Sequence, residues 1–216
     1  MIELIVVCEG LTEAQFVDMV LGPALPHLRV TTRNLAGHLK FERVKTFLRN
    51  TLRSRSEPYV TTFFDLYRLD KGFPDFVATK AVTDPLRRAR RLEEALAAKI
   101  VGVAGCRPGQ FLPHIQPHEF ESLLFADVDE LIRRNDGWSA HAEPLHRARK
   151  GASSPEHIND GAETHPSKRL GGLKPGYSKR MDGPAVAGAI GLPKLRAECA
   201  HFDRWVKRLE KLKPLK

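Results

Sequence analysis

The chain has 216 residues, 42% hydrophobic and 28% charged, a balance that is ordinary for a globular protein. No window reaches the roughly 18 apolar residues of a membrane span. The N-terminus has no basic region followed by a long apolar stretch, which is the pattern of a signal sequence. Three scattered cysteines exclude a disulfide framework and a cysteine-rich zinc module. We therefore expect a cytoplasmic protein that makes no membrane contact and forms one domain over residues 1–216.

The charge is unevenly distributed along the chain. Residues 1–130 contain 17 Lys/Arg and 17 Asp/Glu, whereas residues 131–216 contain 18 and 9, so the net charge of +9 lies in the last part. This divides the expected domain into a neutral core over 1–130 and a basic C-terminal extension over 131–216. Such an excess of positive charge indicates a polyanionic partner, DNA or RNA, although solubility alone is an alternative reason for it.

The first informative stretch is an apolar run that ends in an acid. Residues 4–8 predict a strand covered on both faces, as in a parallel sheet flanked by helices. Glu9 then lies at the carboxyl edge of that sheet, where open α/β folds gather their ligands. Thr12 with Gln15 matches a capping box and predicts a helix over residues 13–21. Taken alone, Glu9 is equally consistent with a helix cap or a lysine pair.

A second acid arrives in the same way. Residues 28–32 predict another strand and Phe41 opens an amphipathic helix, before residues 59–65 form a β-prone run that ends in Asp65. If the strands are adjacent and parallel, Glu9 and Asp65 meet at one edge and repel each other unless a cation lies between them. Oxygen ligands of this kind indicate Mg²⁺ or Mn²⁺. Asp70 in the following loop is a further candidate ligand.

Asp84 and the proline after it open the next helix, in which Leu86, Ala89, Leu92, Leu96 and Ile100 mark the buried face. We interpret the opposite face as solvated scaffold, with the following charged residues: Arg87, Arg88, Arg90, Arg91, Glu93 and Glu94. Residues 110–116 predict another short strand.

That strand runs into His118, Glu119 and Glu121, which precede a helix with an apolar inner face. A histidine with two acids can complete a metal shell or supply a base that activates water. The alternative is a helix N-terminus made favourable by acidic residues.

Residues 133–183 are rich in Gly, Pro, Ser and basic residues, which predicts a loop-rich extension. Loops of this length in a compact domain usually have a function. Lys168, Arg169, Lys179 and Arg180 are the candidates for phosphate contacts, because Arg and Lys beside hydrogen-bonding side chains suit that task. Disorder is the competing interpretation. The histidines of this segment lack metal-ligand spacing and are interpreted as surface residues: His141, His146, His157 and His165. A final helix is expected over residues 195–209.

Taken together, these stretches resemble a bacterial family known only as domain of unknown function 4276, which is regarded as Toprim-like. The resemblance covers nearly the whole chain and is carried by residues 7–13 (VCEGLTE), 61–67 (TTFFDLY), 118–125 (HEFESLLF), 158–161 (INDG), 166–169 (PSKR), 191–192 (GL) and 201–205 (HFDRW). It implies a Toprim-like, Rossmann-like α/β fold with a mostly parallel sheet.

Toprim domains are metal-dependent modules with a glutamate after the first strand and an Asp-x-Asp after a later one. By this resemblance Glu9 is the glutamate, Glu13 closes the same motif, and Asp65 is the first aspartate. Tyr67 stands where the second aspartate is expected. The missing ligand must then come from Asp70, Glu119 or Glu121, or the domain has lost its chemistry.

Two functions follow as hypotheses. In the first, Glu9, Asp65 and Glu119 are the catalytic residues of an Mg²⁺-dependent nuclease or phosphodiesterase that acts on DNA or RNA. In the second, the chain is a non-catalytic subunit that binds nucleic acid or docks on an ATPase. The resemblance also implies an ATPase partner and a role in phage defence, and leaves the oligomeric state open.

Overall fold

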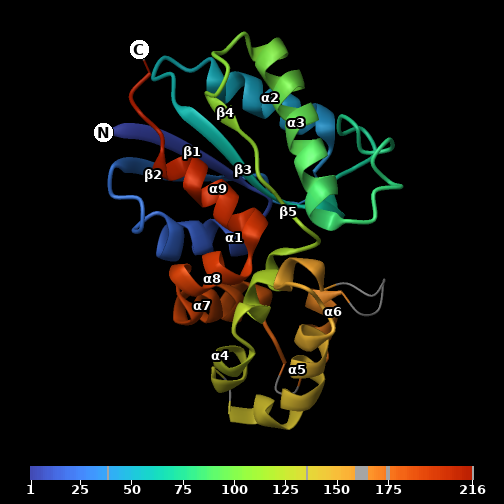
Figure 1. Ribbon diagram of the computed structural model, residues 1–216. Helices are drawn as coiled ribbons and strands as arrows, with labels where there is room; N and C mark the ends of the chain where they lie inside the picture. Colours follow the sequence, from blue (N-terminus) through green and yellow to red (C-terminus); the bar gives the residue numbers. More distant parts are fainter. Residues whose placement is uncertain (38, 135, 159–164, 174–175, 216) are drawn as a thin grey trace.

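The computed structural model describes every residue except 38, 135, 159–164, 174–175 and 216. Its centre is a five-stranded sheet in the order β2-β1-β3-β4, with β5 also paired to β3, and every pairing is parallel (Figure 1). The strands are β1 (Ile2–Cys8), β2 (Leu28–Asn34), β3 (Tyr59–Asp65), β4 (Phe111–Leu112) and β5 (Ile115–Gln116). The predicted α/β class with a mostly parallel sheet flanked by helices is therefore confirmed.

Alternation along the central strand explains why both faces of the sheet are covered. Leu4, Val6 and Cys8 of β1 enter one hydrophobic cluster, whereas Ile5 and Val7 enter another on the opposite face. Successive side chains of a strand point to opposite faces, so a continuous apolar run requires a helical layer on each side.

The two helical layers come from different parts of the chain (Figure 1). On the face of Ile5 lie α2 (Phe41–Leu52) and α3 (Pro85–Ala104). On the face of Leu4 lie α1 (Leu11–Phe16), η1 (Val17–Leu21), α7 (Lys179–Ile190), α8 (Leu192–Glu198) and α9 (Ala200–Glu210). The single helix expected over 195–209 is thus divided at Cys199, which lies between α8 and α9.

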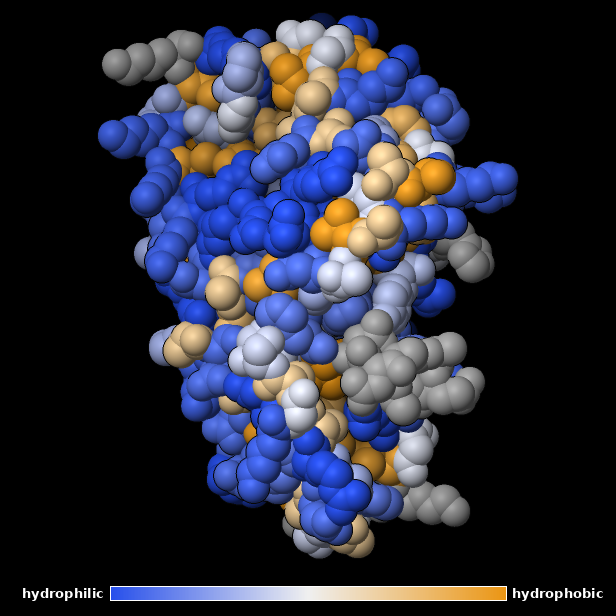
Figure 2. Space-filling model, turned by 45° about the vertical axis from the view of Figure 1, so that its right-hand side comes forward, coloured by the Kyte–Doolittle hydropathy of each residue, from blue (hydrophilic) through white to orange (hydrophobic). Residues whose placement is uncertain are grey.

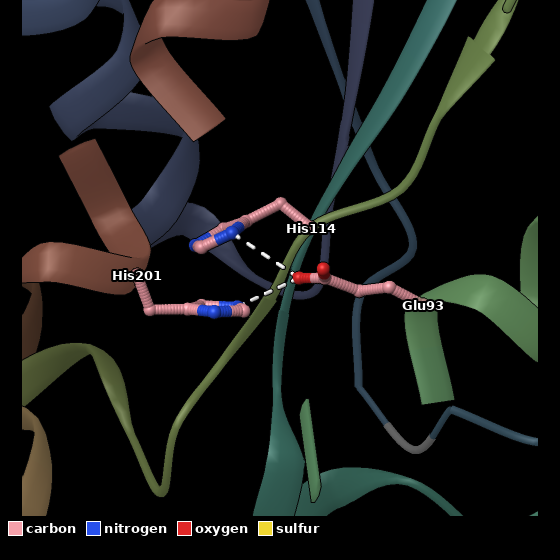
Figure 3. Close-up of side chains that lie close together, drawn as sticks. All are labelled: Glu93, His114 and His201. Carbon is pink, nitrogen blue, oxygen red and sulfur yellow. Dashed lines mark hydrogen bonds and ion pairs between the residues drawn. The ribbon is translucent and has the colours of Figure 1, made fainter. Parts of the chain in front are cut away.

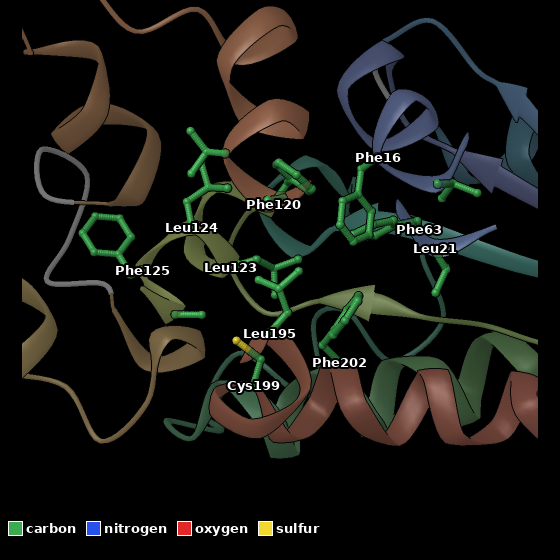
Figure 4. Packing of buried hydrophobic residues seen from close by; sticks show 14 of the residues in the cluster. Phe16, Leu21, Phe63, Phe120, Leu123, Leu124, Phe125, Leu195, Cys199 and Phe202 are labelled. Atoms are coloured by element: carbon green, nitrogen blue, oxygen red, sulfur yellow. The ribbon is translucent and has the colours of Figure 1, made fainter. Parts of the chain in front are cut away.

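Aromatic side chains from distant segments meet in the Leu4-side core (Figure 4). The ring centroid of Phe16 lies 5.9 Å from that of Phe63, 5.4 Å from that of Phe120 and 5.9 Å from that of Phe202. Edge-to-face contacts of this kind add to the free energy gained by burying the rings. The C-terminal helix α9 is therefore built into the same core as β3.

The segment expected to be rich in loops contains several helices among its described residues. The remaining elements are η2 (Leu66–Arg68), η3 (Phe120–Ala126), α4 (Val128–Arg133), η4 (Asp136–His141), α5 (Ala142–Lys150), η5 (Pro155–His157) and α6 (Pro166–Gly171). Helices α4, α5 and α6 form the end of the molecule away from the sheet (Figure 1). Trp138 of η4, Leu145 of α5 and Leu170 of α6 are buried in the core. These helices are too short to show a clear apolar periodicity, so the sequence did not predict them. Within the segment expected to contact phosphates, residues 159–164 lie outside the described part of the structure.

Hydrophilic side chains cover most of the face shown in Figure 2, with hydrophobic ones scattered between them. None of the described helices combines the length and the apolar character needed to cross a membrane.

Candidate metal centres

The carboxyl ends of β1 and β3 bring the first two predicted acids to one edge. Because Cys8 pairs with Phe63 in parallel register, Glu9 directly after β1 and Asp65 at the end of β3 lie at the same carboxyl edge of the sheet. Both side chains are almost fully buried, with 7% of Glu9 and 4% of Asp65 exposed. The two buried carboxyl groups therefore come to one edge, where the charge of Glu9 contributes to raising the pKa of Asp65.

The start of η3 adds two more acids to this edge. Asp65 Oδ1 accepts a hydrogen bond from the backbone N of Phe120 at 2.9 Å, which fixes the start of η3 against the end of β3. Glu119 and Glu121 flank Phe120, and both are buried. The three segments therefore converge because one strand-end carboxylate caps the segment that carries the other two.

Glu13 of α1 is the fifth acid, and it also corrects the predicted helix cap. Its Oε2 accepts a hydrogen bond from the backbone N of Gly10 at 3.0 Å, so the helix begins after Gly10 and not after Thr12. The Thr12 and Gln15 capping box was wrong, because the tight turn after β1 starts the helix two residues earlier. We call Glu9, Glu13, Asp65, Glu119 and Glu121 the acidic edge.

Burial and mutual repulsion raise the pKa values of carboxyl groups in the acidic edge, among them those of Glu9, Asp65 and Glu121. Burial, with the charge of Glu13 next, raises the pKa of Glu9 to about 7, while Arg68 opposes the shift. Burial and the charges of Glu13, Glu9 and Glu121 raise the pKa of Asp65 well above its usual range. Burial also raises the pKa of Glu121. A positive charge placed among these groups is therefore strongly favoured.

Two side chains of this chain supply part of that positive charge. Lys179 Nζ lies 2.9 Å from Glu121 Oε1 and 3.9 Å from Glu119 Oε1, and Arg68 Nε lies 2.9 Å from Glu9 Oε1. Although burial alone would lower the pKa of Lys179, Glu121 and Glu119 raise it. The other oxygens, Oε2 of Glu9 and Oε2 of Glu121, are buried without a hydrogen-bond partner. Unpartnered buried carboxylate oxygens are the donors that a hard divalent cation would take.

Asp70 has contacts that differ from those predicted for a metal ligand. Its Oδ1 accepts hydrogen bonds from the backbone N of Phe41 at 3.3 Å and of Gly72 at 3.0 Å. The side chain thus connects the start of α2 to its own turn, and neither partner belongs to the acidic edge.

Tyr67 and His118 lie beside the acidic edge. The ring centroid of Tyr67 is 5.3 Å from that of His118 and 5.9 Å from that of His165. His118 has a φ of 63°, which is rare for a residue other than glycine, and its buried Nδ1 has no hydrogen-bond partner. Burial lowers the pKa of His118 to about 4, so the imidazole is neutral near pH 7.

Glu119 has two partners that the sequence did not suggest. Its carboxylate accepts hydrogen bonds from the backbone N of Ser167 at 3.0 Å and from Ser167 Oγ at 2.9 Å, and His165 Nδ1 lies 3.3 Å from it. His165 therefore belongs to the site and is not the isolated surface residue expected. The proline before Ser167, which starts α6, was the local signal for a helix N-terminus that presents this N–H group.

Of the predicted phosphate-binding residues, Lys168 and Arg180 are exposed, and Arg169 is half-buried. Lys179 directs its ammonium group to Glu119 and Glu121. Lys168 and Arg169 belong to α6 and Arg180 to α7. Ser167 in the first turn of α6 and Lys179, the first residue of α7, both contact Glu119. The basic residues are thus carried by the helices that border the acidic edge.

A second cluster lies elsewhere and was not predicted (Figure 3). Glu93 of α3, His114 and His201 of α9 are buried and offer three ligand atoms within 4.8 Å of one another, and no other such group occurs in the part of the chain that the structure describes. Glu93 Oε1 lies 2.8 Å from His201 Nε2 and 3.5 Å from His114 Nδ1. This cluster can bind a metal ion.

Glu93 was expected on the solvated face of its helix, and that interpretation was wrong. It is 3% exposed, because α9 and the connection between β4 and β5 cover this side of α3. Burial alone would raise the pKa of Glu93, but His201 and His114 lower it below its ordinary value. Helical periodicity shows one apolar stripe and cannot show a second contact made by a later helix.

Comparison with known proteins gave one family and one solved structure to report. A family model described as Domain of unknown function (DUF4276) matches residues 8–210. The C-terminal region of the Xanthomonas campestris pv. campestris OLD protein superposes with a TM-score of 0.44 and 13% sequence identity, covering 94% of this chain and 95% of that one. The search of curated proteins found no match.

Proposed function

This chain belongs to the family described as Domain of unknown function (DUF4276), and we propose that it is a Toprim-like, Mg²⁺-dependent nuclease or phosphodiesterase acting on DNA or RNA. The observation that supports the proposal most directly is the acidic edge. Its carboxyl groups come from the end of β1, from α1, from the end of β3 and from the start of η3, which only the fold brings together. The pKa values of Glu9, Asp65 and Glu121 are raised, so burying these carboxylates together costs folding free energy near neutral pH, and clusters of this kind are typical of functional sites.

The donor type fits a hard divalent cation, and because no three ligand atoms of the acidic edge, whose residues the structure all describes, lie within 4.8 Å of one another, an ion would have to draw these carboxylates closer together. Glu9 and Asp65 would hold it, and Glu119 and Glu121 would complete its set of oxygen ligands. The Oε2 atoms of Glu9 and Glu121 have no hydrogen-bond partner, so their lone pairs are available to bind the cation. When bound, an Mg²⁺ or Mn²⁺ ion would polarise a phosphoryl oxygen and lower the pKa of a bound water.

The remaining side chains have distinct roles in this proposal. Arg68 and Lys179 hold the carboxylates of Glu9 and Glu121 in place through ion pairs of 2.9 Å. Lys168, Arg169 and Arg180 would bind the phosphates of the nucleic-acid substrate. His118, neutral because burial lowers its pKa to about 4, would accept a hydrogen bond from a bound water at its unpartnered Nδ1.

The basic extension belongs to the same domain in this proposal. One hydrophobic cluster contains Leu4 and Phe63 of the sheet together with Trp138, Leu170 and Phe202 of residues 131–216. A shared core of this kind favours one cooperative unit over 1–216. A cytoplasmic location, an ATPase partner and a role in phage defence complete the proposal and rest on the family resemblance alone.

The test is cleavage of plasmid, single-stranded DNA and RNA with Mg²⁺ or Mn²⁺, in low salt, by the wild type, Glu9→Gln and Asp65→Asn. We expect both substitutions to abolish cleavage, and chelation of the metal to do the same to the wild type. Glu94→Gln is the matched control, since Glu94 is an exposed carboxylate on α3. Metal-dependent cutting that survives both substitutions would reject the assignment.

A non-catalytic subunit is the second candidate, and Tyr67 favours it. Tyr67 takes the position of the second Toprim aspartate, and its ring, 40% exposed, lies against His118. This function predicts salt-sensitive binding of nucleic acid without turnover, unchanged by EDTA. Calorimetric titration with Mg²⁺ separates the two, because a scaffold that has lost its chemistry would bind no Mg²⁺ in the millimolar range.

A further inference from the structure

The buried cluster of Glu93, His114 and His201 presents a hydrogen-bonding conflict. Gln116 Nε2 donates to Ser122 Oγ at 3.1 Å, so the amide oxygen of Gln116 faces His114 Nε2 at 3.2 Å. An amide oxygen only accepts hydrogen bonds, so His114 Nε2 must carry the hydrogen. In a neutral imidazole this leaves Nδ1 with a lone pair.

That lone pair points towards another acceptor (Figure 3). His114 Nδ1 lies 3.5 Å from Glu93 Oε1 and has no hydrogen-bond partner. Glu93 Oε1 already accepts from the backbone N of Ile115 at 3.0 Å and lies 2.8 Å from His201 Nε2. Two acceptors that face each other in a dry interior require either a metal cation or an additional proton between them.

We propose that Glu93 Oε1, His114 Nδ1 and His201 Nε2 bind one divalent cation of the zinc class, at a site separate from the acidic edge. Two imidazole nitrogens and one carboxylate oxygen suit zinc, whereas Mg²⁺ prefers oxygen ligands alone. Ligands about 2.1 Å from a tetrahedral zinc lie about 3.4 Å apart, close to the 3.5 Å between Glu93 Oε1 and His114 Nδ1. The 2.8 Å between Glu93 Oε1 and His201 Nε2 is instead a hydrogen-bond distance that would lengthen when the ion binds.

The groups around the cluster are those that position metal ligands. Gln116 fixes the tautomer and orientation of His114, and Arg204 Nη2 holds Glu93 Oε2 at 2.6 Å, leaving Oε1 to face the imidazoles. The indole of Trp205 stacks on His114 with centroids 4.4 Å apart and planes 7° apart, which restrains the ring further. Metal-bound histidines regularly donate their other N–H to such a partner, as His114 does to Gln116, whereas Nδ1 of His201 is buried without a partner.

The site would be structural, because the three ligands come from segments far apart in the chain and none is accessible to a substrate. Glu93 lies on α3, His114 on the connection between β4 and β5, and His201 at the start of α9. An ion there would join the two helical layers around the edge of the sheet. A second proton shared by His114 and Glu93 is the competing way to resolve the conflict, and the experiment separates the two.

The first measurement uses the full chain purified without a histidine tag. We expect elemental analysis to find about one zinc ion per chain, and Co²⁺ exchanged into the protein to show the visible absorption of a tetrahedral N/O site. Removing the ion should lower the melting temperature, and adding Zn²⁺ should restore it. A folded wild type that takes up neither ion, with an unchanged melting temperature, would show that a proton lies between His114 and Glu93 and would overturn the proposal.

The variants then locate the ion. His201→Asn should lose the zinc, and Gln116→Leu, which removes only the positioning group, should weaken binding about 10- to 100-fold. His146→Asn is the matched control, because His146 Nε2 pairs with Asp129 on the surface at 3.1 Å. If His201→Asn fails to fold, Gln116→Leu and the Co²⁺ spectrum of the wild type still decide. Zinc retained at full affinity by Gln116→Leu would contradict the proposed ligands.

This inference is independent of the nuclease proposal. Glu9→Gln should remove Mn²⁺ binding at the acidic edge and leave zinc binding unchanged, whereas Gln116→Leu should weaken zinc binding and leave Mn²⁺ binding unchanged. Loss of both ions in either variant would mean that the two sites are not separate, which would contradict the inference as stated.

Discussion

Lys179 Nζ lies 2.9 Å from Oε1 of Glu121, a carboxylate that is only 1% exposed. The lysine begins α7 and the glutamate lies in η3, so the contact joins the basic extension to the acidic edge of the sheet. The ammonium group stands next to the oxygens proposed to bind a divalent cation. It partly neutralises the edge and would have to share these carboxylates with a bound ion.

We expect Lys179→Met to destabilise the metal-free protein by about 1–3 kcal/mol. This is less than the roughly 3–5 kcal/mol typical of a fully buried pair, because the Lys179 side chain is 46% exposed. Added Mg²⁺ should recover much of the loss, since the freed carboxylate becomes a better ligand. Urea unfolding with and without Mg²⁺ measures both effects. The control is Lys194→Met, whose pair with Glu198 at 3.2 Å lies on a helix surface and should cost at most about 0.5 kcal/mol.

The pKa of Glu9 predicts how the stability difference between wild type and Glu9→Gln depends on pH. Burial and Glu13 raise this pKa to about 7, so the folded protein holds the proton more tightly than the unfolded chain does. The protonated carboxyl therefore favours folding at low pH, and this contribution is lost as the pH rises through about 7. We expect Glu9→Gln to gain about 3 kcal/mol relative to the wild type between pH 4.5 and pH 8.

The difference between the two proteins is the informative quantity, because other groups titrate in the same range with the opposite sign. Burial lowers the pKa of His114 and of His118 to about 4, which reduces stability as the pH falls. Both proteins share this contribution. Chemical unfolding at several pH values, in EDTA, would check the prediction. A difference that does not change with pH would mean that Glu9 is not held in a repulsive site.

Lys168 and Arg180 should contribute to nucleic-acid binding through phosphate contacts. We expect Lys168→Ala and Arg180→Ala each to weaken binding similarly for unrelated sequences and to reduce the salt slope by about 1. Fluorescence anisotropy at several salt concentrations measures the slope. Lys99→Ala, which removes an exposed lysine from α3, should leave the slope unchanged. Equal effects of all three substitutions would indicate attraction to the net charge alone.

Phe202 connects the C-terminal helix to the N-terminal core, and its removal should destabilise the whole chain. The side chain is fully buried, with its ring centroid 5.9 Å from that of Phe16. We expect Phe202→Ala to cost about 3–5 kcal/mol, and fluorescence and circular dichroism to report one coincident transition. Val77→Ala, at a side chain that is 60% exposed, should change stability by less than about 0.5 kcal/mol. Separate transitions for the two probes would indicate that residues 131–216 form a unit of their own.

The strands, the α/β class and the meeting of Glu9 with Asp65 could be predicted from the sequence, because all three depend on local patterns. Apolar runs of five to seven residues predict buried strands, and buried parallel strands present their last residues at one edge. Glu119 and Glu121 followed from the same rule. The family resemblance named the same residues from their motifs, and the match over residues 8–210 confirms that family.

Only the tertiary structure decided how the later helices complete these sites. Lys179 and His165 reach the acidic edge because α7 and α6 fold back on it, and Glu93 is buried because α9 covers a face that looks solvated in the helix alone. The cluster of Glu93 with His201 joins residues 108 positions apart. The sequence carries no periodic signal for such a contact, because the partner that buries a polar side chain belongs to a different segment and is chosen by packing of the whole chain.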